Sequence, residues 1–188
     1  MDNGSETNIE RISKVKRIVR YSVTVAASVL LIVVCIVVFN FYRLSSDRLF
    51  SENYTAYDLT TTVSESDSTG SKIVKAFREK NYAEVIKLNA TSVLSVKDIF
   101  LTAMSFLETD DPSRAISNFQ VVIADVKGEK NYVLKDAAEY YLALAYLKNN
   151  DYDQAIELMD MIHDNSSHSY SKKFSLKYIR RVKRLKWR

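Results

Sequence analysis

The chain has 188 residues, of which three are Gly, one is Pro and one is Cys. Isolated glycines exclude the Gly-rich loops that hold nucleotide phosphates, and a single Cys excludes a disulfide framework and a Cys-rich zinc site. The net charge of +4 is unevenly distributed: residues 43–171 carry thirteen Lys or Arg and twenty acidic residues, whereas residues 172–188 carry nine and none. This distribution is not typical of a general nucleic-acid binder, so no nucleic-acid partner is expected.

The first predicted element is a transmembrane helix over residues 21–42. Residues 21–39 contain no charged side chain, and a helix of that length is about 28 Å long, enough to cross the hydrocarbon core of a bilayer. A cleaved signal peptide is the alternative, but the apolar run is too long and no small-residue cleavage site follows it. The membrane is therefore one predicted partner of the chain.

The positive-inside rule gives the orientation of this helix. Five Lys or Arg lie in the basic stub of residues 1–20, and two lie within twenty residues after the span. The rule places the stub in the cytoplasm and the C-terminal domain outside the cytoplasmic (inner) membrane, in the periplasm.

Residues 43–70 are predicted to be a polar linker, because they are rich in Ser and Thr. Aromatic and leucine side chains interrupt its first part. Two interpretations stay open: these side chains rest on the membrane surface, or they dock onto the following domain or a partner. The interrupting residues are Leu49, Phe50, Tyr54, Tyr57 and Leu59.

From residue 71 onward the chain has helical periodicity and repeats itself. Residues 77–88, 100–118 and 140–158 each place an apolar helix end, a polar turn and a second helix in the same order. One helical pair cannot bury its apolar face alone, so neighbouring pairs are expected to stack. The anchor positions of the three stretches, where two helices would cross closely, are Val85, Ala115 and Ala155.

The three stretches resemble tetratricopeptide repeats, a helix–turn–helix unit of 34 residues. The third stretch matches at Leu142, Ala143, Tyr146 and Ala155, and the second at Ala103, Phe106, Ala115 and Phe119. The first is a partial or capping repeat. The layout also resembles short, single-pass membrane proteins of Bacteroidetes that carry such repeats, and this resemblance implies a binding module.

The predicted fold is therefore all-α: a transmembrane helix, then a short α-solenoid of helical hairpins, then an amphipathic basic helix. The solenoid domain covers residues 71–188. Two helix starts carry capping signals: Asp111 before Pro112, and Ser95 followed by Asp98. Its units are expected at about 71–92, 95–124 and 133–164, with the terminal helix at 170–186.

The resemblance implies a concave face lined by the first helix of each unit. An apolar strip flanked by Lys suits an extended or helical peptide of another protein. The alternative is that the terminal helix or the segment 49–59 covers the strip. The strip consists of Phe100, Met104, Leu107, Tyr140, Leu144 and Leu147, flanked by Lys97 and Lys148.

The terminal helix is amphipathic, with Phe174, Tyr178, Val182 and Leu185 on one face. One interpretation is a helix that caps the solenoid and turns its charges to solvent. The other is that its basic side chains touch anionic lipid headgroups or an acidic partner. Its candidate binding residues are Lys173, Lys177, Arg180, Arg181 and Arg184.

No arrangement of residues in the sequence predicts catalysis. His163 and His168 lie near Asp160 and Asp164, but no spacing enforces a metal site, and no nucleophile is paired with a base. The chain is expected to be no enzyme and to need neither a metal nor another cofactor.

Three functional hypotheses follow. The favoured one is an interaction module that recruits or scaffolds a protein partner at the outer face of the cytoplasmic membrane. The second is a permanent subunit of an envelope complex, for example one associated with the translocon or with chaperones. The third is a regulator that couples an outside event to the cytoplasmic stub. Whether the chain forms a homo-oligomer stays open.

Overall fold

The structure is a computed structural model, and it describes residues 28–38, 45–59, 72–90, 95–125 and 132–187. The chain divides into two compact units, Met1–Leu44 and Ser45–Arg188. In the first unit, residues 28–38 are helical and their side chains are exposed. The stub and the rest of the predicted transmembrane segment lie outside the described residues. Within the described part of the chain, no helix combines the length and the apolar character needed to cross a membrane.

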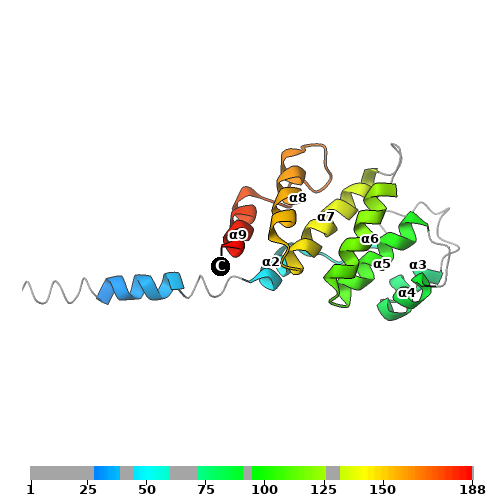
Figure 1. The fold of residues 1–188 in the computed structure, drawn as a ribbon, viewed down its shortest axis with the longest axis horizontal. Helices are drawn as coiled ribbons and strands as arrows, with labels where there is room; N and C mark the ends of the chain where they lie inside the picture. The colour runs from blue at the N-terminus through cyan, green and yellow to red at the C-terminus, as the bar shows by residue number, and fades with distance from the viewer. Residues whose placement is uncertain (1–27, 39–44, 60–71, 91–94, 126–131, 188) are drawn as a thin grey trace, which may run out of the picture. The chain divides into compact units, whose positions relative to one another are not determined.

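The second unit is all-α over its described residues, as predicted, and its helices pack mainly against their neighbours in sequence (Figure 1). The three predicted units are the hairpins α3–α4, α5–α6 and α7–α8. The elements are α2 (Ser46–Asn53), α3 (Lys72–Arg78), α4 (Tyr82–Asn89), α5 (Val96–Glu108), α6 (Pro112–Asp125), α7 (Tyr132–Lys148), α8 (Tyr152–Asp164) and α9 (Leu176–Lys186).

The same turn joins the two helices of each hairpin. Lys80, Asp110 and Asn150 each adopt a positive φ, between 57° and 65°. The amide that follows each of them donates to a carbonyl five residues earlier, as Asp151 does to Tyr146 (2.9 Å). Together with the bond from the positive-φ residue itself, for example from Asn150 to Leu147 (3.2 Å), this pattern is a Schellman motif. The hairpins are thus repeats in backbone geometry, the first one included.

The predicted anchors and caps occupy the positions expected of them. Val85, Ala115 and Ala155 are each 0% exposed, as close helix crossings require. Ser95 and Asp98 form a capping box at the start of α5. Asp111 accepts from the amide of Arg114 (3.1 Å), so it caps α6 as expected.

The terminal helix differs from its prediction in where it begins. Residues 165–175 form a series of turns, and α9 starts only after Ser175, whose side chain accepts from the amide of Tyr178 (3.2 Å). The Ser and Asn side chains of this stretch compete for backbone hydrogen bonds and favour turns over helix. Ser167, for example, donates through its amide to the side chain of Asn165 (3.1 Å).

Residues 45–59, which lie within the predicted linker, form part of the second compact unit. They form α2 and a short extended stretch, which we call the strap (residues 45–59). Leu49, Phe50 and Leu59 are at most 8% exposed, so apolar burial outweighs the polar composition of this segment. Of the two interpretations left open for its aromatic residues, the structure shows docking onto the domain. Residues 60–70 of the predicted linker lie outside the described residues.

Candidate interaction site

The apolar strip predicted on the first helices is buried. Four of its members have no exposed surface, and the other two are at most 3% exposed. α5 packs directly against α7, which brings the two halves of the strip together. The six residues are Phe100, Met104, Leu107, Tyr140, Leu144 and Leu147.

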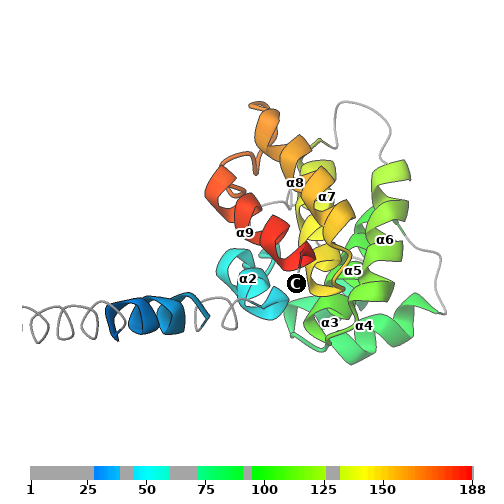
Figure 2. The same cartoon turned by 60° about the vertical axis from the view of Figure 1, so that its left-hand side comes forward.

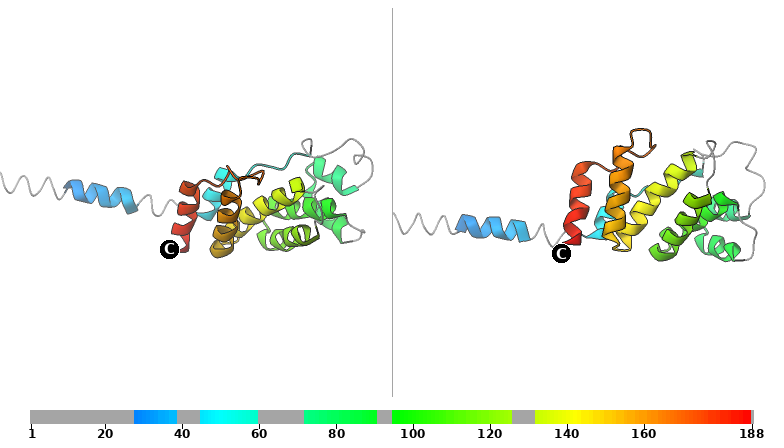
Figure 3. Two further views of the ribbon diagram at one scale, coloured as in Figure 1. Left: turned by 90° about the horizontal axis from the view of Figure 1, so that it is seen from above. Right: turned by 45° about the horizontal axis from the view of Figure 1, so that its top comes forward.

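The strap covers this face of the hairpin row. α2 packs on α7, and the extended part of the strap then runs along the helices toward α5 (Figure 3). There the ring of Tyr57 meets the ring of Phe100 edge-on, with centroids 4.7 Å apart. The covered form of the strip, which was the alternative interpretation, is therefore the arrangement in this structure. A partner peptide on the same face would have to displace the strap.

Tyrosine hydroxyls hold the strap by its main chain. Tyr141 donates to the carbonyl of Thr55 (2.7 Å), and Tyr140 donates to the carbonyl of Asn53. From α9, Tyr178 donates to the carbonyl of Leu49 (2.7 Å). Burial raises the pKa of Tyr178 to about 12 and raises the pKa of Tyr140 and Tyr141 still further, so all three remain donors at neutral pH. These three bonds therefore hold the strap through its backbone carbonyls.

Side chains of the strap add specific contacts. Tyr54 stacks on Phe50 with centroids 4.7 Å apart, and its hydroxyl donates to Glu108 at the end of α5 (2.5 Å). Burial and this bond to an acidic acceptor both raise the pKa of Tyr54 far above its ordinary value. Of the two flanking lysines, Lys148 lies over the ring of Phe50 (4.6 Å) and pairs with Asp110 (2.7 Å). Lys97 is half-buried at the start of α5.

The basic residues of α9 divide into two groups. Three of them hold the helix to its neighbours: Arg181 makes a two-pronged ion pair with Glu52 of α2, and two lysines reach α8. Those lysines are Lys183, which pairs with Asp160 (2.9 Å), and Lys186, which pairs with Asp153 (2.5 Å). Figure 2 shows α9 between α8 and α2. The other candidate binding residues, Lys173, Lys177, Arg180 and Arg184, are exposed.

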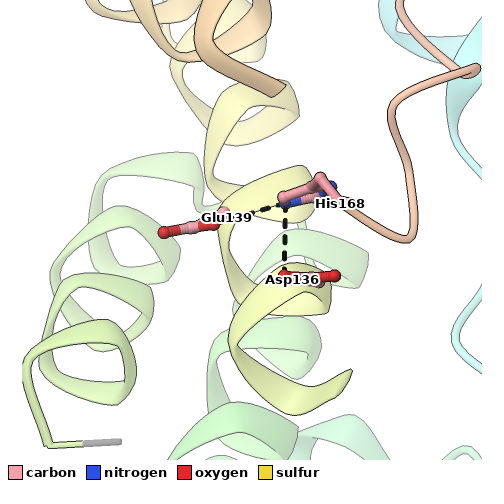
Figure 4. A group of neighbouring side chains, drawn as sticks. All are labelled: Asp136, Glu139 and His168. Carbon is pink, nitrogen blue, oxygen red and sulfur yellow. Dashed lines mark ion pairs between the residues drawn. The ribbon is translucent and has the colours of Figure 1, made fainter. Parts of the chain in front are cut away.

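Asp136, Glu139 and His168 form a buried cluster that the sequence did not predict (Figure 4). The His168 side chain is 2% exposed, and its Nε2 lies 3.3 Å from Glu139 and 3.7 Å from Asp136. Two carboxylates and one imidazole nitrogen within 4.8 Å of one another would suit a divalent metal ion. The sequence associates His168 with Asp160 and Asp164 instead, because nothing in it shows that the turn after α8 folds back onto α7.

The hydrogen bond at the other ring nitrogen opposes metal binding. Tyr170 donates through its amide to Nδ1 of His168 (3.1 Å), so the neutral ring carries its proton on Nε2. A metal held through Nε2 needs the proton on Nδ1, where it would face another N–H donor. Ser169 also donates to Asp136 through both its amide and its hydroxyl (2.7 Å each). The cluster therefore fastens the turn after α8 to α7.

A comparison with protein-family models matches residues 137–169 to the tetratricopeptide repeat. These residues are a tetratricopeptide repeat. They cover most of α7, all of α8 and the turn that carries His168. Searches of curated proteins and of solved structures found no match. The tetratricopeptide repeat implies protein partners in general, and the two preceding hairpins have the same turn geometry.

Proposed function

We propose that this chain is a membrane-anchored interaction module that recruits or scaffolds a protein partner at the outer face of the cytoplasmic membrane. Residues 21–42 are its anchor, with residues 1–20 in the cytoplasm and the helical domain in the periplasm. The uncharged run and the five cations that precede it support the anchor and its orientation. The layout it shares with the short membrane-anchored repeat proteins of Bacteroidetes supports the same assignment by analogy alone.

The tetratricopeptide repeat at residues 137–169 is the observation that carries the interaction function. The strap indicates what the concave face accepts: a segment with aromatic and leucine side chains whose carbonyls meet the hydroxyls of Tyr140 and Tyr141. The partner peptide would likewise present aromatic and leucine side chains and backbone carbonyls, and it would compete with the strap for this face. The strap then acts as an internal ligand, and the apparent affinity for the partner equals the intrinsic affinity multiplied by the fraction of molecules in which the strap is open.

Crosslinking in cells tests this function. A photo-crosslinking residue at position 144, which is fully buried and lies one helical turn from Tyr140, reports what occupies the face. In a chain that carries no other substitution, the crosslinker should capture mainly the strap. Leu49→Glu with Phe50→Glu weakens strap docking, because both side chains are buried, and should increase capture of one discrete partner.

Val121→Glu with Met161→Glu is the matched control, since both are exposed apolar residues (49% and 47% exposed) on α6 and α8. It should leave capture at position 144 unchanged. If the strap variant captures no partner while circular dichroism shows a folded domain, the concave face is not the binding site.

One observation favours the alternative function, a permanent subunit of an envelope complex. Leu49 is 0% exposed, so this side chain of the strap is as deeply buried as the core of the domain. A permanent subunit would keep the strap closed and contact its complex through the outer faces of the helices. Purification in mild detergent separates the two functions, because a permanent subunit stays with its complex at fixed stoichiometry and a recruiter exchanges.

A further inference from the structure

The outward face of α9 combines unpaired cations with exposed apolar side chains. At 3.6 residues per turn, Lys177, Arg180 and Arg184 fall within an arc of about 100°, opposite the buried residues of the helix. None of the three forms an ion pair with any residue that the structure describes. Leu176 and Trp187 share this arc and are 57% and 82% exposed. We call these five residues the outward face of α9.

The other charges of α9 are already used inside the domain. Arg181, Lys183 and Lys186 lie outside this arc and pair with acids of α2 and α8. A helix that only caps the solenoid needs these ion pairs and its buried apolar side chains, and no further contacts. The outward face adds three cations without an ion pair to any described residue, an exposed leucine, and a tryptophan whose ring lies 5.7 Å from Nζ of Lys186. Cations interspersed with Leu and Trp are typical of helices that lie at a lipid headgroup region.

The strap connects this helix to the part of the chain that follows the proposed anchor. In sequence, Ser45 comes three residues after Tyr42, the last residue of the proposed anchor. Within the domain, Leu49 accepts the hydrogen bond from Tyr178 of α9 (2.7 Å), and Glu52 pairs with Arg181 one turn away. The helix that directly follows the proposed anchor in sequence is therefore bonded to α9.

The geometry points to a second membrane contact: the outward face of α9 binds the anionic phospholipid surface beside the anchor. Lys177, Arg180 and Arg184 meet lipid phosphates, and Leu176 and Trp187 enter the headgroup boundary. This contact holds α9 against the bilayer surface. The inference rests on the proposed anchoring by residues 21–42, and its test measures that anchoring and the α9 contact separately.

Trp187 is the single tryptophan of the chain, so its fluorescence reports this face directly. The full-length protein is reconstituted into liposomes of phosphatidylcholine alone, or of phosphatidylcholine with phosphatidylglycerol, each with and without brominated lipid. We expect blue-shifted emission and bromine quenching in the anionic liposomes, both decreasing as salt is raised. Extraction at alkaline pH on the same samples measures whether the anchor is integrated.

The variant K177Q/R180Q/R184Q should lower the equilibrium constant for docking, read from the quenching, by roughly fivefold for each cation removed. K72Q/K75Q/R78Q is the matched control: it removes the same charge from exposed positions on α3 and should leave quenching unchanged. Integration without quenching in anionic liposomes overturns the α9 contact and leaves the anchor standing. Quenching without integration supports the contact and overturns the anchor, and absence of both overturns both. Quenching that the two variants reduce equally also overturns the assignment to α9.

Discussion

The hydroxyl of Tyr178 in α9 donates a 2.7 Å hydrogen bond to the backbone carbonyl of Leu49 in α2, 129 positions earlier in the chain. Both residues are buried, at 5% and 0% exposure. This bond joins the first described helix of the domain to its last helix. The strap therefore closes the row of hairpins, and its release would affect α7 and α9 together.

We expect Tyr178→Phe to loosen the strap, because the carbonyl of Leu49 would stay buried without its donor. The loss should be about 1–2 kcal/mol of strap stability. Hydrogen exchange measured by mass spectrometry should show faster exchange of amides in residues 48–54, with α5 and α6 unchanged. Tyr132→Phe, at an exposed position of α7, is the control. Equal exchange in the two variants would show that the hydroxyl contributes nothing to docking.

Alkaline pH should destabilise the domain through the same side chain. Burial raises the pKa of Tyr178 from 10.0 to about 12, so the unfolded chain loses this proton at a pH where the folded chain still holds it. The stabilisation is complete below pH 10 and is lost as pH rises from 10 to 12, by up to about 2–3 kcal/mol. Tyr140 and Tyr141 act in the same direction. Urea unfolding at pH 8 to 11 measures the decline.

Tyr178→Phe should make this decline shallower, since one of the titrating groups is gone. Absorbance of phenolate near 295 nm in the same samples reports ionisation directly. An identical pH dependence in the variant and the parent would contradict the role assigned to Tyr178.

The ion pair between Glu52 and Arg181 should contribute modestly, since the two side chains are 36% and 23% exposed. A double-mutant cycle with Glu52→Gln and Arg181→Gln should give a coupling of roughly 0.5–1 kcal/mol at neutral pH and low salt. The hydrogen bond from Arg181 lowers the pKa of Glu52 below 4.5. The coupling is thus present above pH 4.5 and is lost as pH falls through the lowered pKa. A coupling that persists in strong acid would rule out this explanation.

Lys80→Gly should stabilise the first hairpin. Lys80 has φ 57°, which costs a residue with a Cβ roughly 1 kcal/mol and glycine almost nothing. The melting temperature of the domain should rise. Lys75→Gly in the interior of α3 is the matched control, and it should lower stability by about 0.5–1 kcal/mol. A fall in both variants would indicate that Lys80 makes a contact worth more than its backbone strain.

The cluster at His168 should stabilise the turn after α8 without binding metal. His168→Ala removes the acceptor used by the amide of Tyr170, and it should destabilise the domain by about 1–3 kcal/mol. Added Zn²⁺ should leave the melting temperature unchanged, because a metal on Nε2 would move the ring proton to Nδ1, where it would face the amide of Tyr170. A zinc-dependent rise in the parent that disappears in Asp136→Asn would instead establish a metal site.

Much of the helical framework was predictable from local signals. The hairpin boundaries, the capping box at Ser95 and the cap at Asp111 depend on residues within a few positions of one another. The anchors at Ala115 and Ala155 follow from repetition, since a small residue recurs where two helices cross. Helical periodicity and capping are properties of short segments, so one sequence is enough to read them.

Long-range packing decided the rest. The apolar strip of Phe100 and Tyr140 is the same in sequence whether it faces solvent, a partner or the strap, and only the fold shows the strap over it. Arg181 and Lys177 are both basic residues of α9. Arg181 nevertheless pairs with Glu52, 129 positions earlier in the chain, whereas Lys177 stays exposed. His168 meets Asp136 and Glu139 for a similar reason, because the turn after α8 folds back onto α7. Local periodicity predicts the helices, turns and repeats. Which face is covered by the strap and which charged residues form ion pairs depend on the distant surfaces that the solenoid brings together.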